Sequence, residues 1–144
     1  MKHQVAVTVF AWAVLLGILI FLRRPAEFDI ALRKYHEFLR RLPRDGEYGQ
    51  FKHPSVVTGY HSDDSGLLGW NTGKGSEIAV CINGTSNSIL HVLLHEFAHT
   101  TVPEYEHSKD FWKSLERVKT LAEEMGLYER IDEKEKICGV HVRD

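Results

Sequence analysis

The segment LLHEFAHTTVPEYEH, residues 93–107, concentrates side chains that bind metal ions and move protons. His95 and His99 are four residues apart, so on a helix they project from one face and can place two imidazole nitrogens on one metal ion. Glu96 directly follows His95, where its carboxylate can reach a water molecule on the metal without binding the metal itself. The spacing predicts a zinc site with Glu96 as the general base.

A third protein ligand is needed, because a catalytic zinc ion keeps three side chains and leaves one position for water. His107 is the best candidate, since it lies eight residues after His99, beyond Pro103, where the chain can fold back under the metal. Four glutamates are alternatives, although each is more simply a solvated surface residue: Glu104, Glu106, Glu123 and Glu124.

His91 lies on the same predicted helix stripe as His95 and His99. The three cannot all bind one ion, because eight residues of helix separate the first and last by about 12 Å, whereas Zn–N bonds are about 2.0–2.1 Å long. A pair formed by His91 and His95 would put Val92 at the position of the base, and valine cannot accept a proton. His91 is therefore expected to be a packed residue or to support the site from outside the ligand set.

Hydrophobic periodicity predicts the elements that must hold this site. Residues 28–42 carry apolar side chains at spacings of three and four, which predicts an amphipathic helix. The segment EIAVCI, residues 77–82, alternates and predicts a strand. A largely apolar helix should begin at the N-cap candidates 86–88 and end at the next proline. A last helix should run from Ser108 to a cap at Gly126.

Residues 47–74, between the first helix and the strand, are rich in Gly, Ser, Asp and Asn. This composition predicts loop or short strand. Tyr60, His61 and Trp70 in this segment are read as packing or surface residues, since single aromatic or histidine side chains in loops are seldom functional. A second group to stabilise an oxyanion cannot be chosen from the sequence, and four side chains stay open: Tyr60, His61, Tyr105 and His141.

Residues 5–22 run for 18 residues without a charged side chain. This is just long enough for a helix to cross a bilayer core of about 30 Å. A cleaved signal peptide is the alternative, but the exit LRRPAE lacks the small residues of a cleavage site. Lys and Arg residues gather after the segment rather than before it, so the positive-inside rule predicts a cytosolic C-terminal side. We expect a single-pass membrane protein with an anchor at 1–24 and a cytosolic domain at 25–144.

The composition, 43% hydrophobic and 26% charged, is typical of one globular domain. Residues 25–144 contain 15 Lys and Arg and 20 Asp and Glu, a net charge of −5. Nucleic-acid surfaces need clustered positive charge, so no nucleic-acid partner is expected. Two cysteines, Cys81 and Cys138, are too few for a disulfide scaffold and form no C-x-x-C pair, which is consistent with a reducing compartment.

The run HEFAHTTVPEYEHSKDFW resembles the signature of the WLM metallopeptidases, a Wss1-like group related to the SprT-like proteins. In that signature HExxH is followed by a further histidine and then by an aromatic pair that opens a helix. The likeness extends over residues 77–142 and is greatest to the small WLM-type proteins of large DNA viruses. It implies zinc ligands at His95, His99 and His107, with Glu96 as the catalytic glutamate.

Two departures limit what this resemblance implies. Glu106 stands before the third histidine, where relatives often have glycine, and could alter the loop or add a carboxylate near the metal. No segment resembles the partner-binding or DNA-binding tails of the larger WLM proteases, so a role in DNA–protein crosslink repair is not implied.

Together these patterns predict an α+β fold, a small zincin-like domain in which the HExxH helix accompanies a short β-sheet, preceded by one N-terminal transmembrane helix. The predicted function is that of a membrane-anchored zinc metallopeptidase, which hydrolyses protein or peptide substrates through a zinc-bound water activated by Glu96. The alternative is a catalytically inactive, membrane-tethered zinc-binding or adaptor protein. An intact Glu96 favours catalysis, because a structural zinc site needs a fourth ligand and no base.

Overall fold

The computed structural model describes residues 2–22, 26–43, 46, 48, 51, 55–62, 66–131 and 135–144, with the side chains of the first helix described over 9–19. In chain order the elements are α1 (Lys2–Leu22), α2 (Glu27–Arg41), β1 (Val56–Tyr60), β2 (Gly69–Thr72), β3 (Glu77–Cys81), α3 (Ser86–Thr101), α4 (Lys109–Glu124), β4 (Glu135–Ile137) and β5 (Val140–Val142). The predicted α+β class is confirmed.

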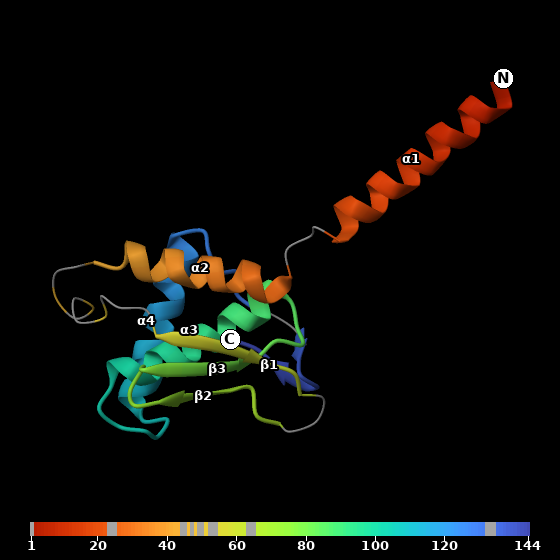
Figure 1. Ribbon diagram of the computed structural model, residues 1–144. Coiled ribbons are helices and arrows are strands. Elements are labelled where there is room, and N and C mark those ends of the chain that lie inside the picture. The colour runs from red at the N-terminus through yellow and green to blue at the C-terminus, as the bar shows by residue number, and fades with distance from the viewer. Residues whose placement is uncertain are drawn as a thin grey trace.

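Strands β1, β3 and β2 form a mixed sheet in that order (Figure 1). β1 pairs with β3 in parallel, and β2 pairs with β3 antiparallel, so β2 is an edge strand. β3 has neighbours on both sides, and its residues 78–81 are all buried. The strand predicted at 77–82 is confirmed. The segment 47–74, expected to be loop or short strand, contains both β1 and β2.

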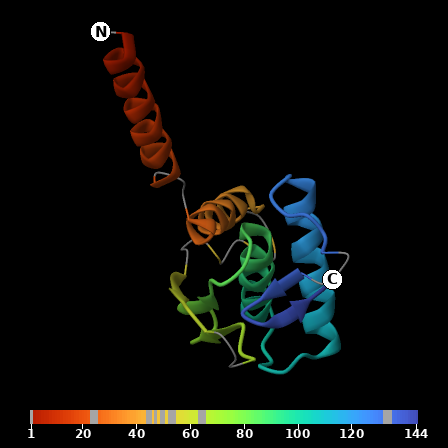
Figure 2. The same ribbon diagram turned by 90° about the vertical axis from the view of Figure 1, so that its right-hand side faces the viewer.

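α3 is the central helix of the fold. It contacts α2, α4, β2, β3 and β4, and Figure 2 shows it between the sheet and α4. Apolar residues on most of its faces account for this position, because a helix that is hydrophobic all round must be buried. Its N-cap is Thr85, whose side-chain oxygen accepts a hydrogen bond from the backbone N–H of Ser88. This cap lies one residue before the predicted candidates at 86–88.

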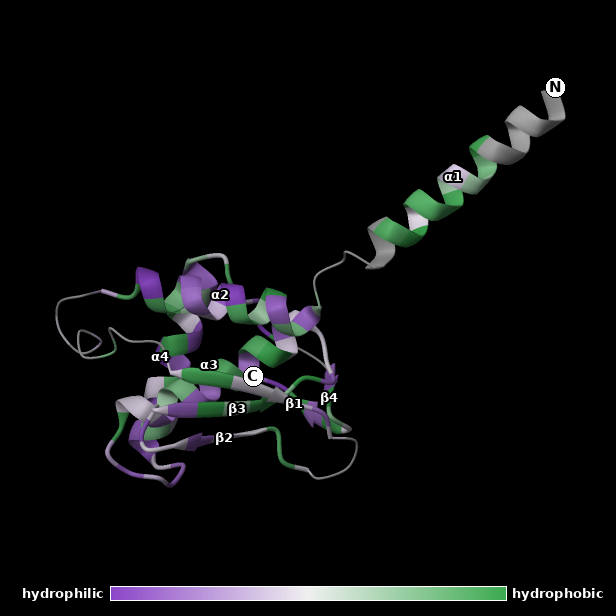
Figure 3. Cartoon of the chain, in the orientation of Figure 1, coloured by the Kyte–Doolittle hydropathy of each residue, from purple (hydrophilic) through white to green (hydrophobic). Residues whose placement is uncertain are grey.

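α2 and α4 are amphipathic helices that pack on α3 with their apolar faces (Figure 3). α4 begins after the N-cap Ser108 and is followed by Gly126 at φ 70°, as the sequence predicts. Aromatic rings from α2 and the segment after it surround Phe97 of α3: Tyr35, Phe38, Tyr48 and Phe51. This cluster fixes α3 from the side opposite its histidines.

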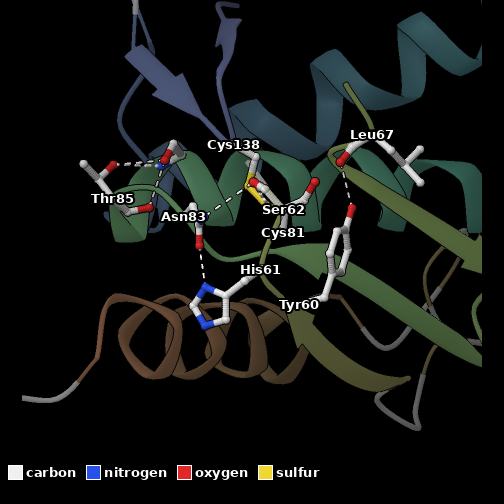
Figure 4. Close-up of a disulfide and its surroundings, with 9 residues drawn as sticks. Tyr60, His61, Ser62, Leu67, Cys81, Asn83, Thr85 and Cys138 are labelled. Carbon is white, nitrogen blue, oxygen red and sulfur yellow. Dashed lines mark hydrogen bonds between the residues drawn. A yellow bond between two sulfur atoms is a disulfide. The ribbon is translucent and has the colours of Figure 1, made fainter. Parts of the chain in front are cut away.

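A disulfide joins Cys81, at the end of β3, to Cys138 in the turn between β4 and β5 (Figure 4). The two Cα atoms are 6.4 Å apart, and the bridge spans 57 residues. Closing a loop of that length stabilises the fold by about 4 kcal/mol in the chain-entropy model. The cysteine count did not predict this single bridge, because only the packing of the β4–β5 hairpin against β3 brings the two sulfurs together.

The buried Lys119 of α4 and Asp144, after β5, form an ion pair whose Nζ and Oδ1 atoms are 2.5 Å apart. The other carboxylate oxygen of Asp144 accepts hydrogen bonds from the Tyr128 hydroxyl at 2.7 Å and the Ile131 backbone N–H at 2.6 Å. The Tyr128 oxygen also lies 2.9 Å from Nδ1 of His91. Burial raises the pKa of Asp144, but these hydrogen-bond donors and Lys119 together lower it by more. The pKa of Asp144 therefore lies below its ordinary value.

Replacing Asp144 by Asn should lower the free energy of unfolding at pH 7 by about 3 kcal/mol, because it leaves the Lys119 ammonium buried without its counter-charge. Since the folded pKa is lowered, the Asp144 contribution is present above the unfolded pKa and is lost as pH falls through the folded one. The difference between wild type and variant should therefore shrink below about pH 4. Urea unfolding across pH 3–7 measures it.

The exposed Glu77→Gln variant, which also removes one carboxylate, is the control and should change stability by less than about 0.5 kcal/mol. A difference for Asp144→Asn that stays constant with pH would contradict the ion pair as its cause.

α1 projects away from the rest of the chain in Figures 1 and 2, and its described side chains, 9–19, are exposed. Within the part of the chain that the structure describes, no helix is both long enough and apolar enough to cross a membrane.

This finding overturns the predicted localisation as a single-pass membrane protein with a cytosolic domain, together with the membrane as a partner of residues 5–22. The predicted division of the chain between residues 24 and 25 falls at positions outside the described residues.

Candidate metal centre

Two elements bring the predicted site residues together. The second half of α3 carries His95, Glu96 and His99, while the loop from 102 to 108 carries His107 back to the helix. α4 begins directly after this loop, and its residue Phe111 packs on all three imidazole rings, with its ring centroid 4.2–5.0 Å from theirs. The buried Phe111 therefore forms a wall behind the histidines.

The Nε2 atoms of the three histidines converge on one point. Nε2 of His107 lies 3.1 Å from Nε2 of His95 and 3.1 Å from Nε2 of His99. Nitrogens that bind one zinc ion tetrahedrally at about 2.05 Å are about 3.3 Å apart, so the observed spacing fits such an ion. Among the described residues, these three form the group of His, Cys, Asp or Glu side chains able to hold a metal ion.

The imidazoles on α3 are held neutral, which is the state in which histidine binds a metal. Burial, together with the smaller effects of the neighbouring His99 and His107, lowers the pKa of His95 to about 3. Burial, together with the smaller effects of His107 and Lys74, likewise lowers the pKa of His99 to about 4.

Glu96 is only 6% exposed and lies outside the histidine group. Burial raises the pKa of its carboxyl to about 7. The side chain lines the same pocket as the three histidines, a cavity of about 260 Å³. Glu96 thus has the placement of a proton acceptor beside a metal rather than of a ligand.

The opposite side of this pocket comes from β2, the turn after it and the loop after α3. It is formed by Gly69, Trp70, Asn71, Lys74 and Tyr105. The interpretation of Trp70 as a packing or surface residue is incomplete, since its half-exposed ring borders the pocket. The sequence did not identify Gly69, Asn71 and Lys74 as pocket residues. The available signal was Gly69 itself, because a glycine inside a strand often marks a place where another segment approaches the backbone closely.

Gly69 is close to the candidate base. A Cβ atom built at this position would lie 2.9 Å from the Ala79 carbonyl oxygen, 2.9 Å from Val92 Cγ1 and 3.1 Å from Glu96 Oε1. The absence of a side chain at Gly69 therefore allows β2 to approach α3 with the Glu96 carboxylate between them.

Replacing Gly69 by Ala should reduce any hydrolytic activity by about 10- to 100-fold while leaving metal content unchanged. Relief of the contacts of the added methyl with Ala79, Val92 and Glu96 shifts β2 relative to the Glu96 carboxylate, whereas no histidine is among its nearest neighbours. Steady-state cleavage rates and elemental analysis measure the two effects. Gly17→Ala, where a Cβ would meet nothing within 4 Å, is the control. Full activity in a folded Gly69→Ala protein would show that Glu96 tolerates the shift.

The structure leaves the other candidate ligands outside the histidine group. His91 is buried and bonded to Tyr128, in keeping with a packed residue. Neither the pocket lining nor the histidine group includes the alternative ligands Glu104, Glu106, Glu123 and Glu124. Of the side chains considered for an oxyanion, Tyr60 bonds the Leu67 carbonyl oxygen and His61 lies against Asn83 (Figure 4), whereas Tyr105 lines the pocket.

Comparison with known proteins finds no matching family model. The chain is 27% identical over 90 residues to an uncharacterized protein of Acanthamoeba polyphaga mimivirus, a match that covers 56% of this chain and 46% of the viral protein. The chain thus matches less than half the length of that relative.

Two solved structures of Wss1 from Saccharomyces cerevisiae are also similar. One has a TM-score of 0.41 and 24% identity, covering 49% of this chain and 62% of that one. The other, a Wss1 mutant, has a TM-score of 0.46 and 22% identity, covering 74% and 90%. The resemblances stated from the sequence, to Wss1-like proteins and to a protein of a large DNA virus, are confirmed as resemblances.

Proposed function

We propose that this chain is a zinc-dependent peptidase of the zincin type, with His95, His99 and His107 as the zinc ligands and Glu96 as the general base. The observation that carries the proposal is the convergence of the three imidazoles, in which Nε2 of His107 lies 3.1 Å from Nε2 of both His95 and His99, beside a buried carboxylate in one pocket. A structural zinc site would need a fourth ligand and would have no use for the carboxylate.

Zinc at this position would supply a Lewis acid that polarises a carbonyl group and makes a water molecule more acidic. The protein supplies the proton transfers. The Glu96 carboxylate takes a proton from the water that attacks the peptide carbonyl and gives it to the leaving amine nitrogen. Tyr105, which lines the pocket, is our candidate for the donor that stabilises the carbonyl oxygen as it becomes negative.

An extended polypeptide is the substrate that suits this pocket. β2 is an edge strand, and its residues Gly69, Trp70 and Asn71 run along the pocket. The free edge of such a strand can pair with a substrate segment through main-chain hydrogen bonds, which are independent of the substrate sequence. A folded protein cannot present its backbone in this way, so we expect cleavage in unfolded segments.

The test is whether the purified chain cleaves an unfolded protein only when zinc is present, and stops when Glu96 is replaced by Gln. The alternative, a zinc-binding protein without turnover, predicts metal binding and no cleavage in either form.

A further inference from the structure

The turn between β2 and β3 has an unusual backbone. Three consecutive residues, Gly73, Lys74 and Gly75, have positive φ values of 58°, 52° and 98°. A lysine in this left-handed region costs about 1 kcal/mol that glycine would avoid. If position 74 served only to form the turn, glycine would be favoured there. The conformational cost therefore indicates that the lysine side chain makes a contact that glycine cannot make.

The Lys74 side chain reaches the end of α3. Its Nζ donates to the carbonyl oxygens of His99 at 3.4 Å, Val102 at 3.0 Å and Glu104. The ring of Tyr105 lies 4.0 Å from the same ammonium. The ammonium thus meets carbonyl oxygens of the last turn of α3, of its C-cap Val102 and of the loop that follows, and a positive charge is favoured at this end of a helix.

A second residue fixes the turn itself to α3. The side-chain amide of Asn71 donates to the Glu96 carbonyl oxygen at 2.8 Å, and its oxygen accepts from the Gly75 backbone N–H at 2.7 Å. The position of the turn is therefore set by the helix that carries the candidate ligands, and Lys74 extends from a fixed base.

The loop that Lys74 contacts is the one that carries His107. Val102 at the start of the loop is buried, but Pro103, Tyr105, Glu106 and His107 are exposed, so the loop after Val102 gains little from hydrophobic burial. Phe111 and Trp112 of α4 pack against the His107 ring. Lys74 holds the start of the same loop from the side of β2.

We infer that Lys74 is a positioning residue for the third metal ligand: by binding the carbonyls of 99, 102 and 104 it holds the loop so that His107 stays with His95 and His99. This inference rests on the proposed zinc site and adds to it the residue that orders the loop. Arginine could not replace it fully, because a planar guanidinium does not match three carbonyls that converge on one point.

Zinc affinity, measured by competition with a chromophoric chelator, tests the inference without any assay of activity. Lys74→Met should weaken zinc binding by about 10- to 100-fold, the usual effect of losing a residue that orients a ligand. Lys74→Gly should weaken it similarly while relieving the positive φ, so a loss of affinity there cannot be ascribed to a strained turn. The matched control is Lys113→Met on the exposed face of α4, which should bind zinc as wild type does.

The same titrations in a His107→Ala background separate positioning from general destabilisation. If Lys74 acts through His107, Lys74→Met should cause no further loss of affinity once His107 is absent. An equal loss of zinc affinity in both backgrounds would overturn the inference. Wild-type zinc affinity in both Lys74 variants, with wild type binding zinc tightly, would overturn it as well. The proposed peptidase would stand in either case. A wild-type chain that binds no zinc would overturn both proposals.

Discussion

Replacing Glu96 by Gln is expected to reduce peptide cleavage by about 10² or more, while zinc content stays near one ion per chain. The amide has almost the same size as the carboxylate, so it fits beside Gly69 and β2, but it cannot accept a proton from water. The histidines do not use Glu96 as a partner in the metal group, so their convergence should survive. Cleavage of an unfolded protein at saturating zinc measures the effect.

Glu124→Gln is the matched control, because it makes the same chemical change on the exposed end of α4. It should cleave at the wild-type rate, which would also exclude Glu124 from the ligand set. A Glu96→Gln protein as active as wild type would refute the proposed base. Absence of zinc-dependent cleavage in wild type itself, across a panel of unfolded substrates, would favour a zinc-binding protein without turnover.

Replacing both His95 and His99 by Ala should abolish zinc binding, so that the metal content of the purified protein falls from about one ion per chain to nearly none. Two of three ligands are then absent, and the remaining His107 lies on an exposed loop that cannot hold zinc alone. Elemental analysis after dialysis against trace zinc measures the content, and thermal unfolding with and without zinc measures the linked stability.

His36→Ala combined with His141→Ala is the control, since both residues are exposed and neither belongs to the histidine group. This double variant should retain the zinc of the wild type. Equal zinc content in the His95→Ala, His99→Ala protein would place the metal elsewhere and contradict the proposed site.

Short-range patterns in the sequence predicted the elements that carry the candidate site. The spacing of His95 and His99 needs only the geometry of one helix, and the amphipathic stripes of α2 and α4 need only a repeat near 3.6 residues. The caps at Ser108 and Gly126 follow from local hydrogen bonding and backbone freedom. The prediction of a membrane-spanning helix at residues 5–22 rested on apolar composition alone and was wrong.

Contacts between distant segments could not be predicted in this way. The third histidine, His107, joins the other two only because the loop after α3 folds back under α4, and the sequence left glutamates as rivals for that place. Gly69 and Lys74 lie in a segment that looked like loop, and their approach to α3 depends on β2 pairing with β3. The Cys81–Cys138 bridge likewise depends on where the hairpin docks.

The sequence by itself determined which side chains could perform chemistry on α3, because their spacing is a property of one continuous helix. Only the tertiary structure decided what surrounds them, namely the third imidazole, the wall formed by Phe111, the close approach of Gly69 and the ammonium of Lys74. The physical reason is that these contacts join segments far apart in the chain. Their geometry is set by the packing of the whole core around α3 and not by any local periodicity.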